Sequence, residues 1–582
     1  MQFRLARPAG RDKNRIENGS NNQAGLKGII TELVIGLDIG TSGVRLQALD
    51  AETKKIISTA ISLHNPLPGS NVIDHLHFAV KAGSAVAHGI ITDTINTLLN
   101  SLEIDLKAVK RMALCGNPTQ MSIFQGMEVR DLVFGGDNML RRLGVKRLDR
   151  RVTVMDAGSL GLAINPEAEV FIPPTIQQQI GADALAMIIK SGILDQKKPC
   201  MVTDYGTNAE IGLKVGDTLY TGSCAAGPAI EGGEIDKGVL ASPGAISDIT
   251  LLENGNWKMQ VLNDDMISQD SFTANSQTGE VQEKLSTYFE PRGITGTGTI
   301  ATMATGFDSG LLQRLPPYIK TPDHCLHITK NQNIVFTPKD YLNSTRCFAA
   351  FKAGHTALVE KSGVAFEDIK SMYLCGASGT YVDAVKAQKM GLALPTVSDI
   401  YQVGNTSLAM ANDCAVDPEC LDKMQEMADS MKPTYFAFIQ DETFKKAYII
   451  EMDHWEHGLT PEKRMFVAKR FRVPSYPEQR TEAKVHKVVI RDIADFGPKG
   501  LHITEHAGII LNATFEGCTG CGICEKNCMS QALRVEENSG QHLIRVSSES
   551  CTGQVCRKCE STCPAKVFRF DDLEFAPWKK AW

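Results

Sequence analysis

The sequence lacks any run of eighteen consecutive apolar residues, so it predicts no transmembrane helix. The basic residues near the N-terminus are not followed by an apolar run of seven, which argues against a signal peptide. We expect residues 1–31 to be a flexible leader and the protein to be cytoplasmic. The net charge is only −6 over 582 residues, so general nucleic-acid binding is not expected either.

Two common nucleotide-binding motifs are missing or incomplete. No Gly-x4-Gly-Lys-Ser/Thr segment occurs, which leaves a P-loop ATPase without support. Residues 296–301 resemble a dinucleotide-binding turn, but no convincing strand precedes them and no acidic residue follows at the required distance. We therefore expect this turn to open a helix. The length and the apolar fraction of 43% predict three or four packed domains.

Cysteine, in contrast, is abundant and clustered. Eight of the sixteen cysteines lie in the last 65 residues, in two runs that differ by two extra residues in the first gap of the second run. The runs are Cys518, Cys521, Cys524 and Cys528, followed by Cys551, Cys556, Cys559 and Cys563. A zinc ribbon would leave the third cysteine of each run without a role, and nothing indicates an oxidising compartment in which disulfides form. This spacing is typical of two 4Fe-4S clusters.

In two-cluster ferredoxins the fourth cysteine of each run binds the other cluster. Cys518, Cys521, Cys524 and Cys563 would then hold one cluster, and Cys551, Cys556, Cys559 and Cys528 the other. The wider gap at residues 552–555 is expected to change the hydrogen bonding to the sulfurs of the second cluster, and with it the potential.

A second feature is a repeated turn. Residues 33–37 read as a strand that runs into Asp38-Ile39-Gly40-Thr41, and residues 199–203 as a strand that runs into Asp204-Tyr205-Gly206-Thr207. Glycine lets the backbone N–H groups approach a phosphate, and an aspartate at a strand end can hold a magnesium-bound water. One such turn could serve hairpin geometry alone, whereas two copies in matching contexts favour a nucleotide site.

Two further glycine-rich elements follow in order. Residues 372–375 read as a strand that leads into Gly376-Ala377-Ser378-Gly379, and residues 404–409 open another helix. The series resembles the superfamily of acetate and sugar kinases, heat-shock chaperones and actin, which implies an α/β actin-like, two-lobed ATPase. With the cysteine runs, the expected fold is this ATPase followed by an α+β two-cluster bacterial-type ferredoxin domain.

The superfamily resemblance implies roles for individual residues. Asp38 and Asp204 would be the magnesium-binding and catalytic carboxylates. The phosphate-binding residues would be Gly40, Thr41, Ser42, Gly206, Thr207 and Asn208, and the adenosine loop would be Gly376, Ala377, Ser378 and Gly379. The implied cofactors are ATP with magnesium and two 4Fe-4S clusters.

The segments 156–174 and 180–184 are similar to those of the reductive activators of corrinoid proteins. Members generally carry an N-terminal plant-type 2Fe-2S domain, which is missing here and is replaced by the C-terminal cysteine runs. From Leu33 onward the chain resembles in particular the activators that serve the methylamine methyltransferases of methanogens. The resemblance implies ATP-dependent reduction of an inactive Co(II) corrinoid protein to Co(I), with a low-potential electron donor.

Two other functions remain open at this point. An activator of a radical dehydratase or aromatic-ring reductase uses the same superfamily, although such chains are shorter and carry one cluster. A chaperone-like assembly ATPase with structural clusters is the alternative from another class.

We expect five parts: a leader at 1–31, ATPase lobe I at 32–199, lobe II with the adenosine motif at 200–455, a basic connector at 456–500 and the ferredoxin domain at 501–582. The connector is expected to be a semi-ordered joint that is either simply solvated or a docking surface for an acidic partner. The eight remaining cysteines are expected to be mostly buried thiols. The histidine-containing segments 74–77 and 453–457 are expected at the surface.

Overall fold

The computed structural model describes residues 32–575, except 70, 135–136, 177–179, 207, 226–228, 230–233, 432–433, 480, 505–507, 529, 539, 552 and 554–555. The leader at 1–31 therefore lies outside the described residues. In these ranges no helix is both long and apolar enough to cross a membrane.

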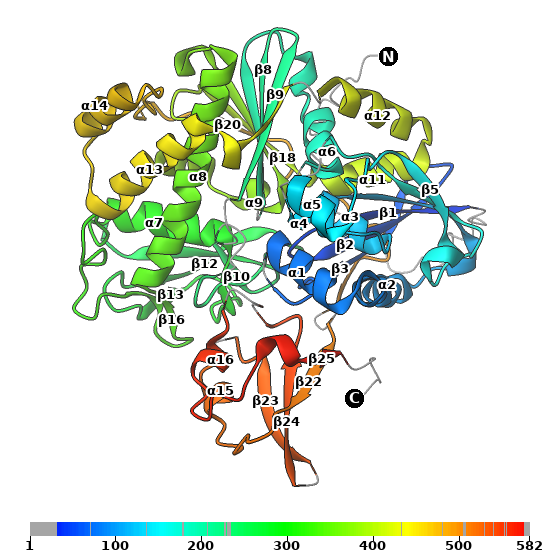
Figure 1. Ribbon diagram of the computed structural model, residues 1–582. Coiled ribbons are helices and arrows are strands. Elements are labelled where there is room, and N and C mark those ends of the chain that lie inside the picture. The colour runs from blue at the N-terminus through cyan, green and yellow to red at the C-terminus, as the bar shows by residue number, and fades with distance from the viewer. Residues whose placement is uncertain are drawn as a thin grey trace, which may run out of the picture. The chain divides into compact units, whose positions relative to one another are not determined.

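The first ATPase lobe is built on a seven-stranded mixed sheet (Figure 1). Its strands, in spatial order, are β21 (Leu501–Thr504), β3 (Ile56–Ser62), β2 (Val44–Asp50), β1 (Leu33–Ile39), β4 (Val109–Gly116), β6 (Glu169–Ile172) and β5 (Thr153–Asp156). Strand β1 is buried along its whole length, which explains its nearly continuous apolar sequence. Helices α1 (Val72–Ala82), α2 (Ser84–Ser101), α3 (Pro118–Phe124), α4 (Arg130–Val133) and α5 (Asp137–Leu143) belong to this lobe.

The second lobe repeats this plan. Its strands, in spatial order, are β19 (Tyr435–Ala437), β9 (Thr218–Ala225), β8 (Asn208–Val215), β7 (Cys200–Tyr205), β17 (Ser371–Cys375), β18 (Asp399–Gly404) and β20 (Lys484–Lys487). Each lobe has a central strand that pairs antiparallel with the next strand in the chain and parallel with a later one: β1 with β2 and β4, and β7 with β8 and β17. The repeated hairpin that the sequence predicts is thus the centre of both sheets.

The remaining elements of the second lobe cover its sheet or extend it. A five-stranded sheet consists of β13 (Val281–Lys284), β12 (Ser268–Ala274), β11 (Trp257–Leu262), β10 (Ala245–Leu251) and β14 (Gly293–Ile294). A separate two-stranded sheet consists of β15 (Leu326–Thr329) and β16 (Ile334–Phe336). The helices are α7 (Gly296–Asp308), α8 (Pro338–Ser362), α9 (Gly376–Tyr381), α10 (Ala384–Met390), α13 (Glu442–His457) and α14 (Pro461–Phe471). The turn at residues 296–301 opens α7, as expected.

A layer of helices lies between the two main sheets. Helix α6 (Ala182–Ser191) contacts β4 and β7, and α11 (Thr406–Val416) packs on β1 and β4 with α12 (Glu419–Met431) beside it. Because side chains alternate along a strand, Ile35 of β1 joins the core of lobe I while Val34 joins the layer of α6 and α11. Helix α11 therefore packs on the lobe I sheet, although the sequence assigned it to lobe II, whereas α12 contacts α6, α11 and β9.

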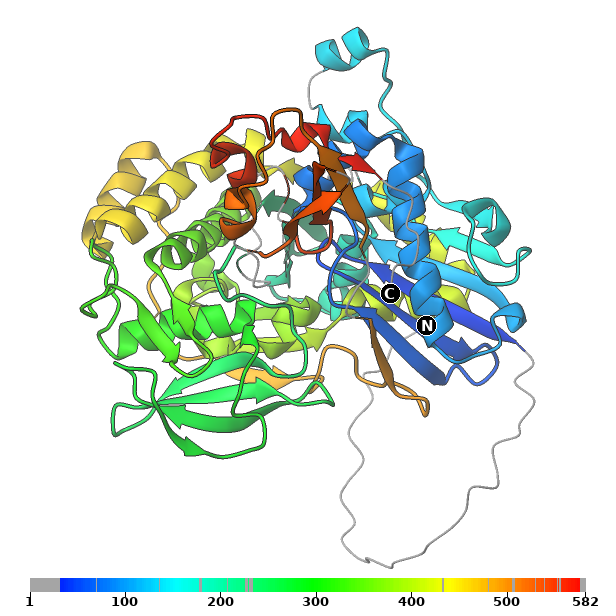
Figure 2. The same ribbon diagram turned by 90° about the horizontal axis from the view of Figure 1, so that it is seen from below.

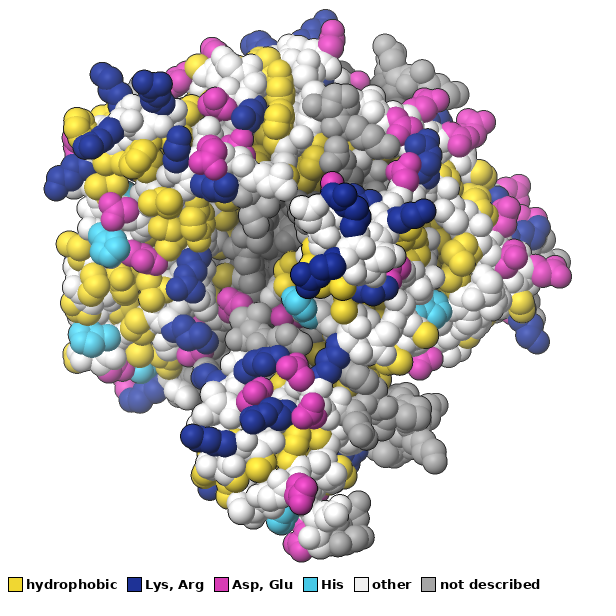
Figure 3. Space-filling view, in the orientation of Figure 1, with side chains coloured by type: hydrophobic (Ala, Val, Ile, Leu, Met, Phe, Trp, Pro, Cys, Tyr) yellow, Lys and Arg dark blue, Asp and Glu magenta, His cyan; other side chains and the backbone are white. Residues whose placement is uncertain are grey.

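The segment expected to be a semi-ordered connector instead forms regular structure. It contains α14, and β20 completes the second sheet by pairing parallel with β18. The buried Arg464 of α14 forms an ion pair with the equally buried Glu451 of α13 at 3.2 Å. One of the basic residues that suggested a solvated segment is thus paired inside the fold. Other Lys and Arg side chains gather on the surface at α14 (Figure 3).

The iron-sulfur segment has its own four-stranded antiparallel sheet of β23 (Leu533–Asn538), β24 (Gln541–Ser547), β22 (Ile510–Thr514) and β25 (Glu574–Phe575), with the short helices α15 (Ile523–Lys526) and α16 (Lys558–Ser561). β21, which the sequence placed in this domain, pairs instead with β3 of lobe I, and Figure 2 shows it beside the lobe I strands. Leu511 and Phe568 share a core cluster with Leu76 and Phe78 of α1. The domain is therefore packed against lobe I.

Two expectations about side chains need correction. Cys414 and Cys420, two of the eight cysteines expected to be mostly buried thiols, form a disulfide between α11 and α12. Cys115, Cys200, Cys224, Cys347 and Cys375 are buried thiols, as expected. His75 and His454, expected at the surface, are buried because each hydrogen-bonds inside the fold.

Candidate functional site

The two predicted aspartates occupy equivalent positions at the ends of the central strands. Asp38, the penultimate residue of β1, pairs with Arg45 of β2, and Asp204, the penultimate residue of β7, pairs with Glu210 of β8. On their other sides the partners are Cys115 and Cys375. The internal repeat thus brings two carboxylates to the same edge of two related sheets.

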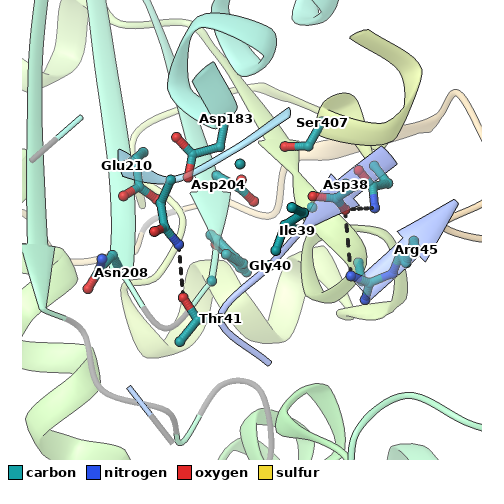
Figure 4. Close-up of a pocket in the computed structure, with 17 residues that line it drawn as sticks. Asp38, Ile39, Gly40, Thr41, Arg45, Asp183, Asp204, Asn208, Glu210 and Ser407 are labelled. Carbon is teal, nitrogen blue, oxygen red and sulfur yellow. Dashed lines mark hydrogen bonds and ion pairs between the residues drawn. The ribbon is translucent and has the colours of Figure 1, made fainter. Parts of the chain in front are cut away.

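These carboxylates meet in a cavity of about 640 Å³, including its open mouth. The lining residues are Asp38, Ile39, Gly40, Thr41, Arg45, Gly116, Asn117, Asp183, Asp204, Tyr205, Gly206, Asn208, Glu210, Gly376, Ala377, Asn405 and Ser407. Figure 4 shows Asp183 and Glu210 beside Asp204, with Asp38 on the side of Arg45.

Asp38 is held by groups from two elements. Burial raises the pKa of its carboxyl, while the Arg45 guanidinium, 3.6 Å away, and the Asn405 amide oppose that rise. Asn405 Nδ2 donates to Asp38 Oδ2 at 3.1 Å, and Asn405 Oδ1 accepts from the Leu408 N–H as the N-cap of α11. One side chain thus fixes both the carboxylate and the helix that crosses lobe I.

The cavity is strongly acidic. Burial raises the pKa of Asp183 to about 6. Burial also raises the pKa of Glu210 well above its usual value, and the neighbouring Asp183 and Asp204 add to that rise. Such a site repels phosphate unless a cation intervenes. Among the described residues no three His, Cys, Asp or Glu side chains converge on one metal position, so magnesium would be shared with the phosphates and water, as it prefers.

The glycines of the two motifs permit close backbone approach. Gly40 N–H donates to Gly43 O at 3.0 Å in the first turn, and Asn117 Nδ2 donates to Thr41 Oγ1 at 3.0 Å. Gly376 has φ +80°, and a Cβ at this position would overlap Asp204 Oδ1. The adenosine turn and the second phosphate turn are therefore in direct contact.

The structure brings together most of the predicted nucleotide-binding residues. The cavity wall contains Asp38, Gly40, Thr41, Asp204, Gly206, Asn208, Gly376 and Ala377. Three described residues, Ser42, Ser378 and Gly379, are not part of this wall, and Thr207 lies outside the described residues. The Gly379 carbonyl accepts from Gln402 Nε2 at 2.8 Å.

Sequence reasoning missed Arg45, Asn117, Asp183, Glu210, Asn405 and Ser407 as site residues. Glu210 and Arg45 had a usable signal, since in a tight hairpin the residue that faces each aspartate follows six or seven positions later. Asp183 has no such signal, because it reaches the cavity from α6.

The cysteines group as the crossed arrangement predicts. Cys518, Cys521, Cys524 and Cys563 line one cavity whose other walls include Phe515, Val535, Ile544 and Phe568. Cys563 comes from the second run, so the two runs do meet at this point. An apolar cavity lined by four thiols from both runs is the kind of site that a 4Fe-4S cluster occupies.

The other four cysteines also act on one another. Burial, together with smaller contributions from Cys559, Cys528 and Cys556, raises the pKa of Cys551 to about 12. The Gly553 N–H donates to Cys551 Sγ at 3.4 Å, which is a typical bond to a cluster-binding sulfur. Within the wider gap, Thr552, Gln554 and Val555 lie outside the described residues.

Three family models match the chain. They are described as the RACo middle region over residues 33–196, the C-terminal ASKHA domain of RACo over residues 198–465, and a 4Fe-4S dicluster domain over residues 517–567. The boundary between the first two models falls before β7, where the sheet of lobe II begins.

Among curated proteins, a [Co(II) methylated amine-specific corrinoid protein] reductase of Methanosarcina barkeri is 40% identical over 520 residues, which cover 89% of this chain and 95% of the relative. A corrinoid activation enzyme of Eubacterium limosum is 26% identical over 397 residues, covering 63% of this chain and 61% of that protein. Among solved structures, a reductive activator for a corrinoid iron-sulfur protein matches with a TM-score of 0.61 and 23% identity, covering 73% of this chain and 66% of that chain. This last match supports the fold.

Proposed function

The chain belongs to the family of corrinoid-protein reductive activators, and we propose that it uses ATP to deliver one electron to the cobalt of a corrinoid protein. The observation that carries the proposal is the union, in one chain, of the paired-aspartate cavity and two sets of four cysteines. The Methanosarcina relative is named for a Co(II) protein specific to methylated amines. We take the same class of substrate for this chain, with Co(I) as the product.

The combination has an energetic reason. An electron transfer that is unfavourable by roughly 200 mV requires about 5 kcal/mol, since ~59 mV corresponds to about 1.4 kcal/mol for one electron. Binding and hydrolysis of ATP between two lobes can supply free energy of that size through a change in conformation. The iron-sulfur clusters, when bound, supply one-electron transfer at low potential.

Each part of the cavity has a definite task in this reaction. Asp38 and Asp204 hold the magnesium ion and its water, and Gly40, Thr41, Gly206 and Asn208 bind the phosphates. Gly376 and Ala377 approach the adenosine. Asp183, with a pKa of about 6, adds negative charge at pH 7, so that the nucleotide binds as its magnesium complex, whereas the raised pKa of Glu210 favours its neutral form.

The decisive experiment mixes the protein anaerobically with ATP, magnesium, a strong reductant and a Co(II) methylamine-type corrinoid protein. We expect the Co(I) absorbance band to appear only when ATP is present. Asp204→Asn should abolish that signal while retaining iron, whereas the matched change at the exposed Asp195 should leave it intact. An ATP-independent signal, or none with any corrinoid partner, would favour the assembly ATPase instead.

The count of two clusters is tested separately. Cys521→Ala should remove one cluster, so bound iron should fall by about half with loss of electron delivery. Cys325→Ala is the control, because this cysteine lies in the ATPase part of the chain. Unchanged iron in Cys521→Ala would refute the ligand assignment.

A further inference from the structure

A short segment joins the first phosphate turn to the loop of the second cysteine run. It consists of residues 65–69, Asn65-Pro66-Leu67-Pro68-Gly69, between β3 and α1, and we call it the strut. Its two prolines restrict backbone rotation, and Leu67 is fully buried. The strut is therefore a stiff element with chemically different sites at its two ends.

At one end the strut contacts the nucleotide cavity. The buried Asn65 donates from Nδ2 to the carbonyl of Gly40 at 2.9 Å. Its Oδ1 accepts from the N–H of Leu67 at 3.0 Å, which fixes the amide orientation. A shift of the Gly40 turn on binding phosphate would therefore act directly on the strut.

At the other end the strut contacts the iron-sulfur domain. The Ser548 hydroxyl donates to Pro66 O at 2.6 Å, and Gly69 N–H donates to Cys551 O at 3.0 Å. Ser548 is fully buried, and its hydroxyl also accepts from the Ile509 N–H. Two residues of the cluster domain thus bind the strut through its backbone.

A second set of buried bonds runs parallel to the first. Asn117, which donates to Thr41, also accepts from Gln120 N–H at 3.0 Å. The Gln120 side chain bonds to His75 Nδ1 at 2.6 Å, and His75 Nε2 lies 3.3 Å from Gly69 O. This route also ends at Gly69.

The state of His75 agrees with these contacts. Burial lowers the pKa of His75 to about 4, so its ring is neutral at pH 7. A neutral ring has one donor and one acceptor. With Nε2 donating to Gly69 O, Nδ1 accepts from Gln120 Nε2, and Gln120 Oε1 stays available to accept from Asn65 Nδ2 at 3.3 Å. With His75 neutral, each of these hydrogen bonds therefore has one donor and one acceptor.

Gly553, in the wider gap of the second cysteine run, lies at the end of this connection. Gly553 has φ +68°, and a Cβ at this position would lie 3.0 Å from Gly69 Cα. Its N–H donates to Cys551 Sγ. Hydrogen bonds to cluster sulfurs tune the reduction potential, so a displacement of Gly69 would change the environment of this cluster.

We propose that the strut conveys nucleotide binding at Gly40 and Thr41 to the cluster held by Cys528, Cys551, Cys556 and Cys559, and shifts its reduction potential. Asn65, Gln120, His75 and Ser548 are positioning residues in this connection. The inference rests on the proposed function for the nucleotide and the clusters, but not on the identity of the electron acceptor.

The test uses the full-length protein with its clusters and no corrinoid partner. A magnesium complex of a non-hydrolysable ATP analogue should shift the midpoint potential of one cluster in an EPR-monitored titration. It should also slow amide hydrogen exchange in peptides that cover residues 547–551. Asn65→Ala should keep its iron and bind the analogue within about threefold of the unmodified protein, yet show both responses at reduced size, because only the route through His75 remains.

Asn96→Ala is the matched control, because Asn96 also donates to a backbone carbonyl at 2.9 Å within lobe I, but to Gly161. It should retain both responses. Ser548→Ala removes the hydrogen bond to Pro66 O at the iron-sulfur end of the strut. It serves as the test variant if Asn65→Ala fails to fold. The double variant should be no worse than either single variant, because both break one connection.

The proposal is overturned if both responses persist at full size in Asn65→Ala or in Ser548→Ala, or if the unmodified protein shows no response to nucleotide. If nucleotide produces both responses but no corrinoid protein is reduced, the proposed role of the strut is supported and the proposed electron acceptor is wrong. The two failures are thus distinguishable.

Discussion

At the scale of single residues, the nucleotide cavity depends on glycines, which leave room for close contacts, as much as on polar side chains. Gly376 has a positive φ and abuts Asp204, so this position tolerates neither the backbone strain nor the bulk of a side chain. Asn405 links Asp38 to the start of α11. Small changes at these positions should therefore affect catalysis more than stability.

Gly376→Ala should lower the ATP-dependent rate of Co(I) formation at least tenfold, because the new Cβ displaces the Asp204 carboxylate. The strain of a positive φ should also cost about 1 kcal/mol of stability. Gly310→Ala is the control, since Gly310 has φ +70° and open space around it. It should show the loss of stability, measured by denaturant unfolding, without the loss of rate.

The raised pKa of Asp183 predicts two opposite pH trends. Its carboxyl has a pKa of about 6 in the folded protein, above the unfolded value. Without nucleotide, the unmodified protein should therefore lose stability relative to Asp183→Asn as the pH rises through about 6. Affinity for magnesium ATP should instead fall as the pH drops through that value, by up to about tenfold per pH unit. Thermal unfolding and nucleotide titration at pH 5 to 8 test both; parallel trends would contradict the assignment.

At the scale of elements, α11 connects the lobes because it can approach β1 closely. Gly36 provides that approach: a Cβ there would overlap the Asn412 amide oxygen and lie 2.8 Å from its backbone nitrogen. Asn412 also donates to Gln47 Oε1 of β2 at 2.7 Å. The helix that carries Asn405 to the cavity is thus positioned by one glycine in the central strand.

Gly36→Ala should destabilise the protein by about 1 to 3 kcal/mol, the usual cost of overpacking, and weaken nucleotide binding as α11 moves away. Gly89→Ala in α2 is the matched change, because no atom lies within 4 Å of the added Cβ. It should instead stabilise the protein by about 0.5 to 1 kcal/mol. Equal unfolding midpoints for the two variants would exclude this role of Gly36.

At the scale of the whole molecule, the iron-sulfur domain is attached to lobe I at several points. β21 extends the lobe I sheet just before the domain begins, and the domain core is continuous with α1. Gly69 and Pro66 add hydrogen bonds to the domain. This arrangement favours transmission of conformational changes over a freely swinging carrier.

Six Gly and Ser residues inserted between β21 and β22 should therefore leave iron content and direct reduction of the clusters unchanged, but lower ATP-dependent cobalt reduction severalfold. The physical reason is that a longer connection weakens the docking of the domain on lobe I. The same insertion in the exposed turn at residues 253–255 is the control. A domain that swings freely would tolerate the first insertion equally well.

Several features were readable from the chain because they are local. The spacing of Cys518 to Cys528 and of Cys551 to Cys563 predicts clusters without a fold, and two copies of an Asp-x-Gly-Thr turn predict a repeated lobe. Both signals occupy fewer than about fifteen residues each. The placement of β20 and β21 was missed because their short sequences pair only with distant strands.

The sequence by itself determined which chemical groups this protein carries: paired aspartates in glycine-rich turns, and eight cysteines in two runs. Only the tertiary structure decided which side chains surround them, because Asp183 reaches the cavity from α6 and Asn405 from the start of α11. It also decided that Asn65 and Gly69 connect that cavity to Cys551. Such contacts join residues hundreds of positions apart, and hydrogen-bond geometry between them exists only once the lobes and the iron-sulfur domain have packed.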